Sequence, residues 1–154
     1  MSNQILVLGA GAWGTALALH AARTGGAVHV WARQTRPLPS GAMPRLPDFP
    51  LPDTIRVSSE LPSGPLACVL VAIPTQALAS VMPLLPKGVP VLLCCKGIER
   101  GTLAFPLDIL ARERPDIAGA VLSGPHFPRA IAAGPPAASV LAAAHRPPPR
   151  TPAD

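Results

Sequence analysis

Length, composition and charge exclude several classes of protein. The chain has 154 residues, enough for one domain or for part of a larger one. Hydrophobic residues make up 49% and charged residues 14%, which is too apolar for intrinsic disorder, and 22 prolines exclude an all-helical bundle. The net charge of +5 comes mostly from scattered arginines that form no stripe, so nucleic-acid binding is only a distant alternative.

The termini and the cysteines indicate a cytoplasmic protein. No basic residue precedes the first short apolar stretch, so no signal peptide is expected. Every long apolar run is interrupted by Gly or Pro, so no transmembrane helix is expected either. Cys68, Cys94 and Cys95 lie in apolar runs without metal-ligand spacing, which predicts buried, reduced thiols and no metal site.

Short apolar strands alternate with helices along the chain. Strands are expected at residues 5–8, 27–31, 55–58, 68–73, 90–95, 120–123 and 138–141, and helices at 13–24, 77–85 and 102–112, the last with Thr102 as N-cap. Residues 34–52 hold six prolines, so no helix or central strand can cross them. The pattern predicts a Rossmann-like α/β fold, a doubly wound parallel sheet, over residues 1–144, followed by a structureless Pro-rich tail at 145–154.

A glycine-rich turn follows the first strand. Gly9, Gly11 and Gly14 form a GxGxxG pattern that opens a helix, with Ala12 and Trp13 inside it. In a dinucleotide-binding fold these glycines permit a tight turn, a close approach to pyrophosphate, and close helix–strand packing. We therefore expect dinucleotide binding here. A purely structural turn is the alternative.

The end of the second strand bears on the choice of dinucleotide. Folds selective for NAD carry an acidic residue there, but this chain has Arg33 and no acid until Asp48. An arginine can pair with a 2′-phosphate, so the sequence favours NADP(H) over NAD(H) or at least tolerates it. A solvated loop arginine is the alternative.

Three further segments follow strands at the edge where open α/β sheets bind ligands. Pro74-Thr75-Gln76 could contact the cofactor or simply start a helix. Lys96 offers an ammonium group to a phosphate or a carbonyl oxygen. Residues 123–127 (SGPHF) could hold substrate, and His126 is an acid–base candidate or an incidental loop histidine.

These segments together resemble the bacterial-type NAD(P)-dependent glycerol-3-phosphate dehydrogenases. The resemblance spans about residues 4–142 and is more specific than a generic dinucleotide-binding match. It is carried by GAGAWGTALA (9–18), LPDFPLPDTI (46–55), VAIPTQAL (71–78), KGIERGT (96–102), LSGPHF (122–127) and AAGPPAASVLA (132–142).

The resemblance implies a cytosolic oxidoreductase that interconverts dihydroxyacetone phosphate and sn-glycerol 3-phosphate for phospholipid synthesis, and a homodimer in the full-length family. It implies no nucleic-acid or membrane partner. Dinucleotide contacts would come from Ala12, Trp13, Arg33 and Pro128. Lys96 would contact both cofactor and substrate, and Gly124 and His126 would lie against the substrate.

The sequence also departs from the family. Ser or Thr usually stands at the position of His126, Ala at Pro128 and an acidic residue at Ala130. Members carry a helical C-terminal domain with the acid–base lysine, and this sequence stops before it. No residue can therefore take that catalytic role, and the expectation is a shortened chain that binds cofactor with little turnover. A related dehydrogenase with another substrate and a non-catalytic NADPH-binding module remain alternatives.

Overall fold

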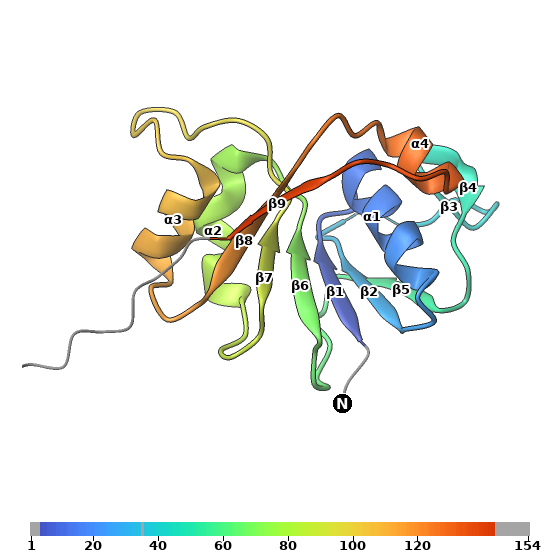
Figure 1. Ribbon diagram of the computed structural model, residues 1–154. Helices are drawn as coiled ribbons and strands as arrows, with labels where there is room; N and C mark the ends of the chain where they lie inside the picture. The colour runs from blue at the N-terminus through green and yellow to red at the C-terminus, as the bar shows by residue number, and fades with distance from the viewer. Residues whose placement is uncertain (1–3, 35, 144–154) are drawn as a thin grey trace, which may run out of the picture.

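One mixed sheet organises the chain. The computed structural model describes residues 4–34 and 36–143. Its main sheet has the strand order β5-β2-β1-β6-β7-β8-β9, and all neighbours pair in parallel except β8 and β9 (Figure 1). The strands are β1 (Ile5–Leu8), β2 (Val28–Trp31), β5 (Ile55–Ser58), β6 (Cys68–Val71), β7 (Val91–Leu93), β8 (Gly119–Ser123) and β9 (Val140–Ala143). The α/β sheet expected from the sequence is confirmed, with one antiparallel strand at its edge.

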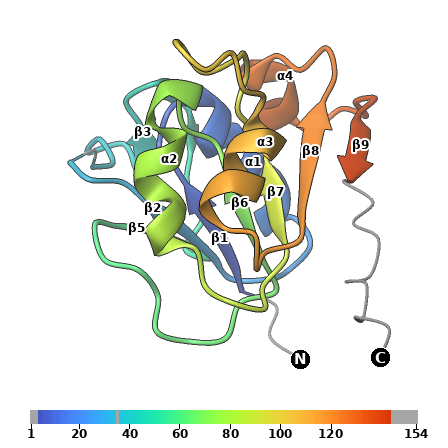
Figure 2. The same ribbon diagram turned by 90° about the vertical axis from the view of Figure 1, so that its left-hand side faces the viewer.

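Helices cover both faces of the sheet (Figures 1 and 2). On one face α1 (Ala12–Ala22) packs against α4 (Pro128–Ala133), and the other face carries α2 (Leu78–Val81) and α3 (Pro106–Glu113). Side chains of β1 alternate between the two layers, because successive residues of a strand point to opposite faces. Leu6 and Leu8 pack under α2 and α3, while Val7 packs under α1.

The composition of α1 suits a helix held between two layers. Most of its residues are buried, including Gly14, Ala16 and Ala18. A helix that is apolar on all sides needs cover on all sides, and small side chains let neighbours approach closely. The sheet and α4 supply that cover, so the N-terminus of α1 is fixed at the carboxyl edge of β1.

The proline-rich segment forms a small hairpin. Strands β3 (Ala42–Met43) and β4 (Leu46–Pro50) pair antiparallel in a separate two-stranded sheet. Residues 34–52 indeed contribute no helix and no strand to the main sheet within the described part of the chain. A two-stranded hairpin tolerates these prolines because each of its strands has a free edge. Met43 and Leu46 of the hairpin bury their side chains against the α1 layer.

The region after β6 is less helical than the sequence predicts. The strand ends at Val71 rather than Ile73, and the expected helix is a 3₁₀ turn (η1, Thr75–Ala77), one α-turn (α2) and a second 3₁₀ turn (η2, Met82–Leu84). Pro83 lies at the start of η2, where its missing N–H and ring disrupt the α-helical ladder.

The predicted start of the third helix is wrong. Helix α3 begins at Pro106 with Phe105 as N-cap, so Thr102 does not cap it. Because the residue before a proline avoids helical angles, Phe105 is extended (φ −76°, ψ 160°) and its N–H donates to Asp108 Oδ2 at 3.0 Å. Thr102 instead closes the preceding loop, where its hydroxyl accepts a hydrogen bond from the Ala104 N–H at 3.2 Å.

Helix α4 was not predicted. It begins at Pro128 and ends before Gly134, which adopts φ +100°, so its ends follow the common preference for proline at the start and glycine after the end. Arg23 of the α1 C-cap donates to the carbonyl oxygens of Ile131 and Ala132. Strand β9 also begins and ends two residues later than predicted and runs antiparallel.

Some expectations fall outside the described residues. One is the predicted tail at 145–154. The other is the expected absence of a signal peptide, which depends on the first three residues. In the part of the chain that is described, no helix combines the length and the hydropathy that a bilayer-spanning segment needs.

Candidate dinucleotide and substrate sites

The glycine-rich turn joins β1 to α1. Gly9 has φ +114°, and a Cβ there would lie 2.5 Å from the Ala72 carbonyl oxygen. A Cβ on Gly14 would lie 2.0 Å from the Gly9 carbonyl oxygen, whereas one on Gly11 would meet nothing within 4 Å. Gly9 and Gly14 are thus required by the fold itself. Gly11 leaves open space, as the approach of a ligand to the backbone requires.

The first turn of α1 is free to bind an anion. Gly11 is the N-cap, and no side chain of the described residues caps the helix. The first N–H groups of a helix lack partners within it, and the helix dipole places partial positive charge at the same end. Backbone groups of residues 12–14 therefore suit a phosphate group.

A cavity of about 910 Å³ lies beside this turn. The loop at Gly9–Ala12 forms one wall and the end of β2 forms another. The sequence candidates Gly9, Gly11, Ala12, Arg33 and Pro74 all line it, together with Arg45, which the sequence reasoning did not single out. We name it the glycine-turn cavity.

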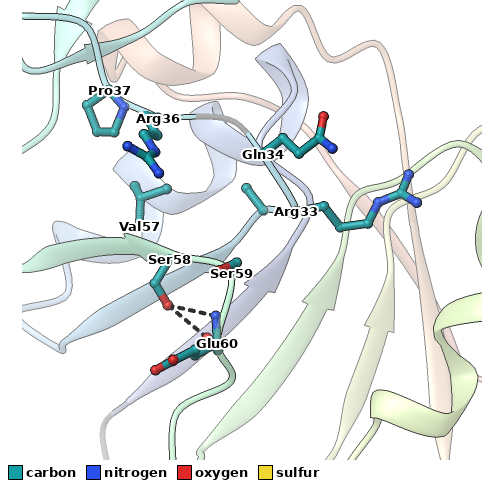
Figure 3. Close-up of a pocket in the computed structure, with 9 residues that line it drawn as sticks. Arg33, Gln34, Arg36, Pro37, Val57, Ser58, Ser59 and Glu60 are labelled. Carbon is teal, nitrogen blue, oxygen red and sulfur yellow. Dashed lines mark hydrogen bonds between the residues drawn. The ribbon is translucent and has the colours of Figure 1, made fainter.

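A second cavity of about 880 Å³ adjoins it at the ends of β2 and β5. Figure 3 shows the guanidinium of Arg36 over Val57, while Arg33, which lines both cavities, extends away from Ser58. Within residues 4–34 and 36–143, neither guanidinium has a hydrogen bond or an ion pair. Ser58 Oγ accepts from the Glu60 N–H at 3.1 Å and donates to the Glu60 carbonyl at 2.9 Å. Because Arg33 and Arg36 have no partner among the described residues, their guanidinium groups remain available to an anionic ligand.

Arg45 reaches the glycine-turn cavity from the turn between β3 and β4. Arg129 of α4 pairs with Asp48 and lies 6.0 Å from the centre of the Phe49 ring, so α4 holds the hairpin in place. The signal for Arg45 in the sequence was weak, because a single arginine among prolines resembles a solvated loop.

Side chains of the segment after β6 form hydrogen bonds with the loop that contains Lys96. Thr75 is buried and its hydroxyl donates to the Lys96 carbonyl at 2.8 Å. Gln76 Nε2 donates to the Ile98 carbonyl at 2.8 Å, and Gln76 Oε1 accepts from the Arg100 N–H at 2.9 Å. These side chains are thus engaged in supporting the loop, while Pro74 faces the glycine-turn cavity.

Lys96 and His126 line a third cavity of about 380 Å³. We name it the lysine pocket. It lies between the ends of β7 and β8, and its walls include Trp13, Ser123 and Gly124. The structure thus brings together residues from three separate segments of the sequence, at Trp13, Lys96 and 123–126. Pro128 lines none of these three cavities and instead begins α4.

The three cysteines are buried or partly buried thiols, as predicted. Burial raises the pKa of Cys94 to about 12 and that of Cys95 to about 11, and it raises the pKa of Cys68 as well. Because the thiolate is the reactive form, these thiols are inert at neutral pH. Cys94 and Cys95 belong to the core, whereas Cys68 is partly buried.

Comparisons with known proteins agree with this geometry. The pattern of the NAD-dependent glycerol-3-phosphate dehydrogenase N-terminus matches residues 4–147. The chain is 43% identical over 144 residues to a glycerol-3-phosphate dehydrogenase (NAD(P)+) of Gluconobacter oxydans, covering 91% of this chain and 44% of the relative. Its counterpart in Afipia carboxidovorans is 42% identical over 154 residues, covering 94% and 47%. The chain therefore spans about half the length of these curated relatives.

Solved structures show the same arrangement. A glycerol-3-phosphate dehydrogenase from Coxiella burnetii superposes with a TM-score of 0.80 at 30% identity, over 92% of this chain and 47% of that one. A glycerol-3-phosphate dehydrogenase from Saccharomyces cerevisiae gives 0.74 at 21% identity, over 98% and 50%, which shows the shared fold alone.

Proposed function

Because the chain belongs to the family of NAD-dependent glycerol-3-phosphate dehydrogenase N-terminal domains, we propose that its glycine turn binds the pyrophosphate of a nicotinamide dinucleotide. The observation that supports this proposal is the open N-terminus of α1. Its first turn has no side-chain cap, Gly11 has open space where a Cβ would lie, and a cavity of about 910 Å³ adjoins it. Free N–H groups and the helix dipole favour a phosphate at this place.

NADP(H) is the dinucleotide that we propose. A 2′-phosphate needs cations near the end of β2, and Arg33 and Arg36 supply two guanidinium groups there. The acidic residue typical of NAD-selective folds is absent from the end of β2. Glu60 lines the second cavity, but in Figure 3 its carboxylate points away from Arg33.

Dihydroxyacetone phosphate and sn-glycerol 3-phosphate are the proposed substrate pair, bound in the lysine pocket. Lys96 offers an ammonium group to the phosphate or to the C2 oxygen, and Gly124 and His126 line the same wall. The bound dinucleotide would supply or accept the hydride at C2. The residues of this chain would bind and orient the substrate beside it.

Binding and turnover test the two parts of the proposal separately. Isothermal titration of the 154-residue chain should show NADPH binding more tightly than NADH. Absence of binding by both nucleotides would contradict the proposal. Oxidation of NADPH is then followed with dihydroxyacetone phosphate, with Lys96→Met as the control. Any turnover should fall in that variant, and a preference for a ketone without phosphate would identify a different dehydrogenase.

A further inference from the structure

The described residues that line the lysine pocket include an ammonium group and an imidazole but no carboxylate. Among the described residues that line it, only Cys95, Lys96 and His126 titrate. Burial raises the pKa of Cys95 to about 11, so this thiol is neutral at physiological pH. An anion in the pocket therefore meets the ammonium group of Lys96 and the imidazole of His126.

His126 is held in a fixed position. Only 6% of the residue is exposed, and its ring stacks on Trp13 with centroids 5.3 Å apart and an interplanar angle of 14°. Nε2 lies 3.1 Å from the Ala138 carbonyl oxygen and 2.7 Å from Ser139 Oγ. In the neutral ring Nε2 either donates to the Ala138 carbonyl or accepts from the Ser139 hydroxyl, and in the imidazolium form both ring nitrogens carry hydrogen. The ring nitrogen without a hydrogen is the atom that gains the proton.

Trp13 connects His126 to Lys96. Its Nε1 donates to the Cys94 carbonyl at 3.0 Å, which fixes the indole at the end of β7. Lys96 Nζ lies 5.6 Å from the centre of the same ring. The electron-rich face of an indole attracts cations, so one ring supports both the ammonium group and the imidazolium form of His126.

We propose that anion binding in the lysine pocket is coupled to protonation of His126. The proposal rests on the function proposed above, since the anion would be the phosphate of the substrate. A bound dianion favours the imidazolium form, and by reciprocity the imidazolium strengthens anion binding. The one bond formed is an N–H bond on the imidazole ring of His126, with the proton taken from solvent. Affinity then rises as pH falls, at most about tenfold per pH unit for one proton.

Sulfate is a suitable probe, because it stays a dianion where a phosphate ester takes up a proton near pH ~6. Calorimetry in two buffers of different ionisation enthalpy measures the protons taken up by the chain on sulfate binding. We expect uptake of up to one proton and a Kd that falls several-fold between pH 8 and pH 6. His126→Asn should abolish both effects. The matched variant His20→Asn, at an exposed position on α1, should keep them.

Unchanged proton uptake in His126→Asn would overturn the proposal, as would failure of sulfate to bind at either pH. NADPH affinity measured on the same samples separates the two proposals. If NADPH binds but sulfate binding does not depend on pH, only the proposed coupling is wrong. If the unaltered chain does not bind NADPH, the proposed function is contradicted.

A second measurement needs no change at His126. In Trp31→Phe the chain retains Trp13 as its single tryptophan, and a protonated imidazole stacked on an indole quenches its fluorescence. Emission should fall as pH decreases, and saturating sulfate should move the midpoint to higher pH. A midpoint that does not move would overturn the proposal even if His126→Asn fails to fold.

Discussion

Gly11 and Gly14 lie in the same turn but differ in what a methyl group would meet. At Gly14 a Cβ would lie 2.0 Å from the Gly9 carbonyl oxygen, and at Gly11 it would meet nothing within 4 Å. We expect Gly14→Ala to destabilise the chain by about 1–2 kcal/mol, because the overpacking outweighs the better helix propensity of alanine.

The contrasting variant is Gly11→Ala, which should alter stability by about 1 kcal/mol or less, since only the N-cap preference changes. It should weaken NADPH binding at least ~10-fold, because the methyl group occupies the space proposed for the pyrophosphate. Thermal unfolding and nucleotide titration of the two variants check this pair. Equal losses of stability would contradict the division of roles.

Arg33 and Arg36 bear on nucleotide selectivity. Both guanidinium groups line the second cavity without a hydrogen bond or ion pair in the described part of the chain. A charge-assisted hydrogen bond is worth about 1.5–3 kcal/mol, so Arg33→Gln or Arg36→Gln should weaken NADPH binding ~10-fold or more. NADH affinity should change little, and so should NADPH affinity in the control Arg56→Gln. A parallel loss for both nucleotides would point to a general defect instead.

At the scale of elements, Arg114 ties the end of α3 to η2. Its guanidinium donates to the Met82 carbonyl at 2.9 Å and the Leu85 carbonyl at 2.6 Å, and it pairs with Asp116 at 2.8 Å. The hydrogen bond from Arg114 lowers the pKa of Asp116 to about 2. Arg114 thus connects the end of α3 to η2, and the charged carboxylate of Asp116 holds its guanidinium in place.

Acid should weaken this contact. A carboxyl group whose pKa is lowered by folding stabilises the fold above its unfolded pKa of about 3.9, and this contribution disappears as pH falls from about 4 to 2. Asp116→Asn should therefore differ from the unaltered chain at pH 6 and converge with it near pH 2. Urea unfolding at several pH values measures the difference, with Asp53→Asn as control. A difference that is constant with pH would contradict this assignment.

The way the elements pack decides which predicted boundaries hold. The strands of the main sheet lie close to their predicted positions, because continuous apolar runs suit strands covered on both faces. The third helix starts later than expected because Pro106 sets its first turn. Helix α4 was missed because its six residues carry few large apolar side chains, and it is held by Arg23 and by packing on α1.

At the scale of the whole molecule, thiol labelling reports opening of the core. Burial raises the pKa of Cys94 to about 12 and that of Cys95 to about 11. At pH 8 the folded chain should thus react with iodoacetamide at these two thiols at least ~100-fold more slowly than free cysteine does, because a shift of one pKa unit changes the thiolate fraction about tenfold. Labelling should accelerate along the urea unfolding curve measured by fluorescence. Fast labelling of both thiols without denaturant would show that the sheet opens locally near β7.

The glycine turn, the approximate positions of the main strands and the family were all within reach of the sequence, since each depends on local spacing and hydrophobic pattern. The proposed roles of Arg33, Lys96 and His126 stay predictions. Their positions alone did not indicate that Trp13 stacks on His126 or that Ser139 contacts the same imidazole. Arg45 was not predicted to line a site, because nothing near it in the chain distinguishes it from a solvated loop residue.

Sequence by itself thus determined the α/β class, the place of the dinucleotide turn and the thiols of the core. Only the tertiary structure decided which distant side chains share a cavity, that Thr75 and Gln76 support the Lys96 loop, and that the pocket around Lys96 contains no acid among its described lining residues. The physical reason is that secondary structure follows from neighbours along the chain, whereas a site forms where separate strand ends converge at one edge of the sheet.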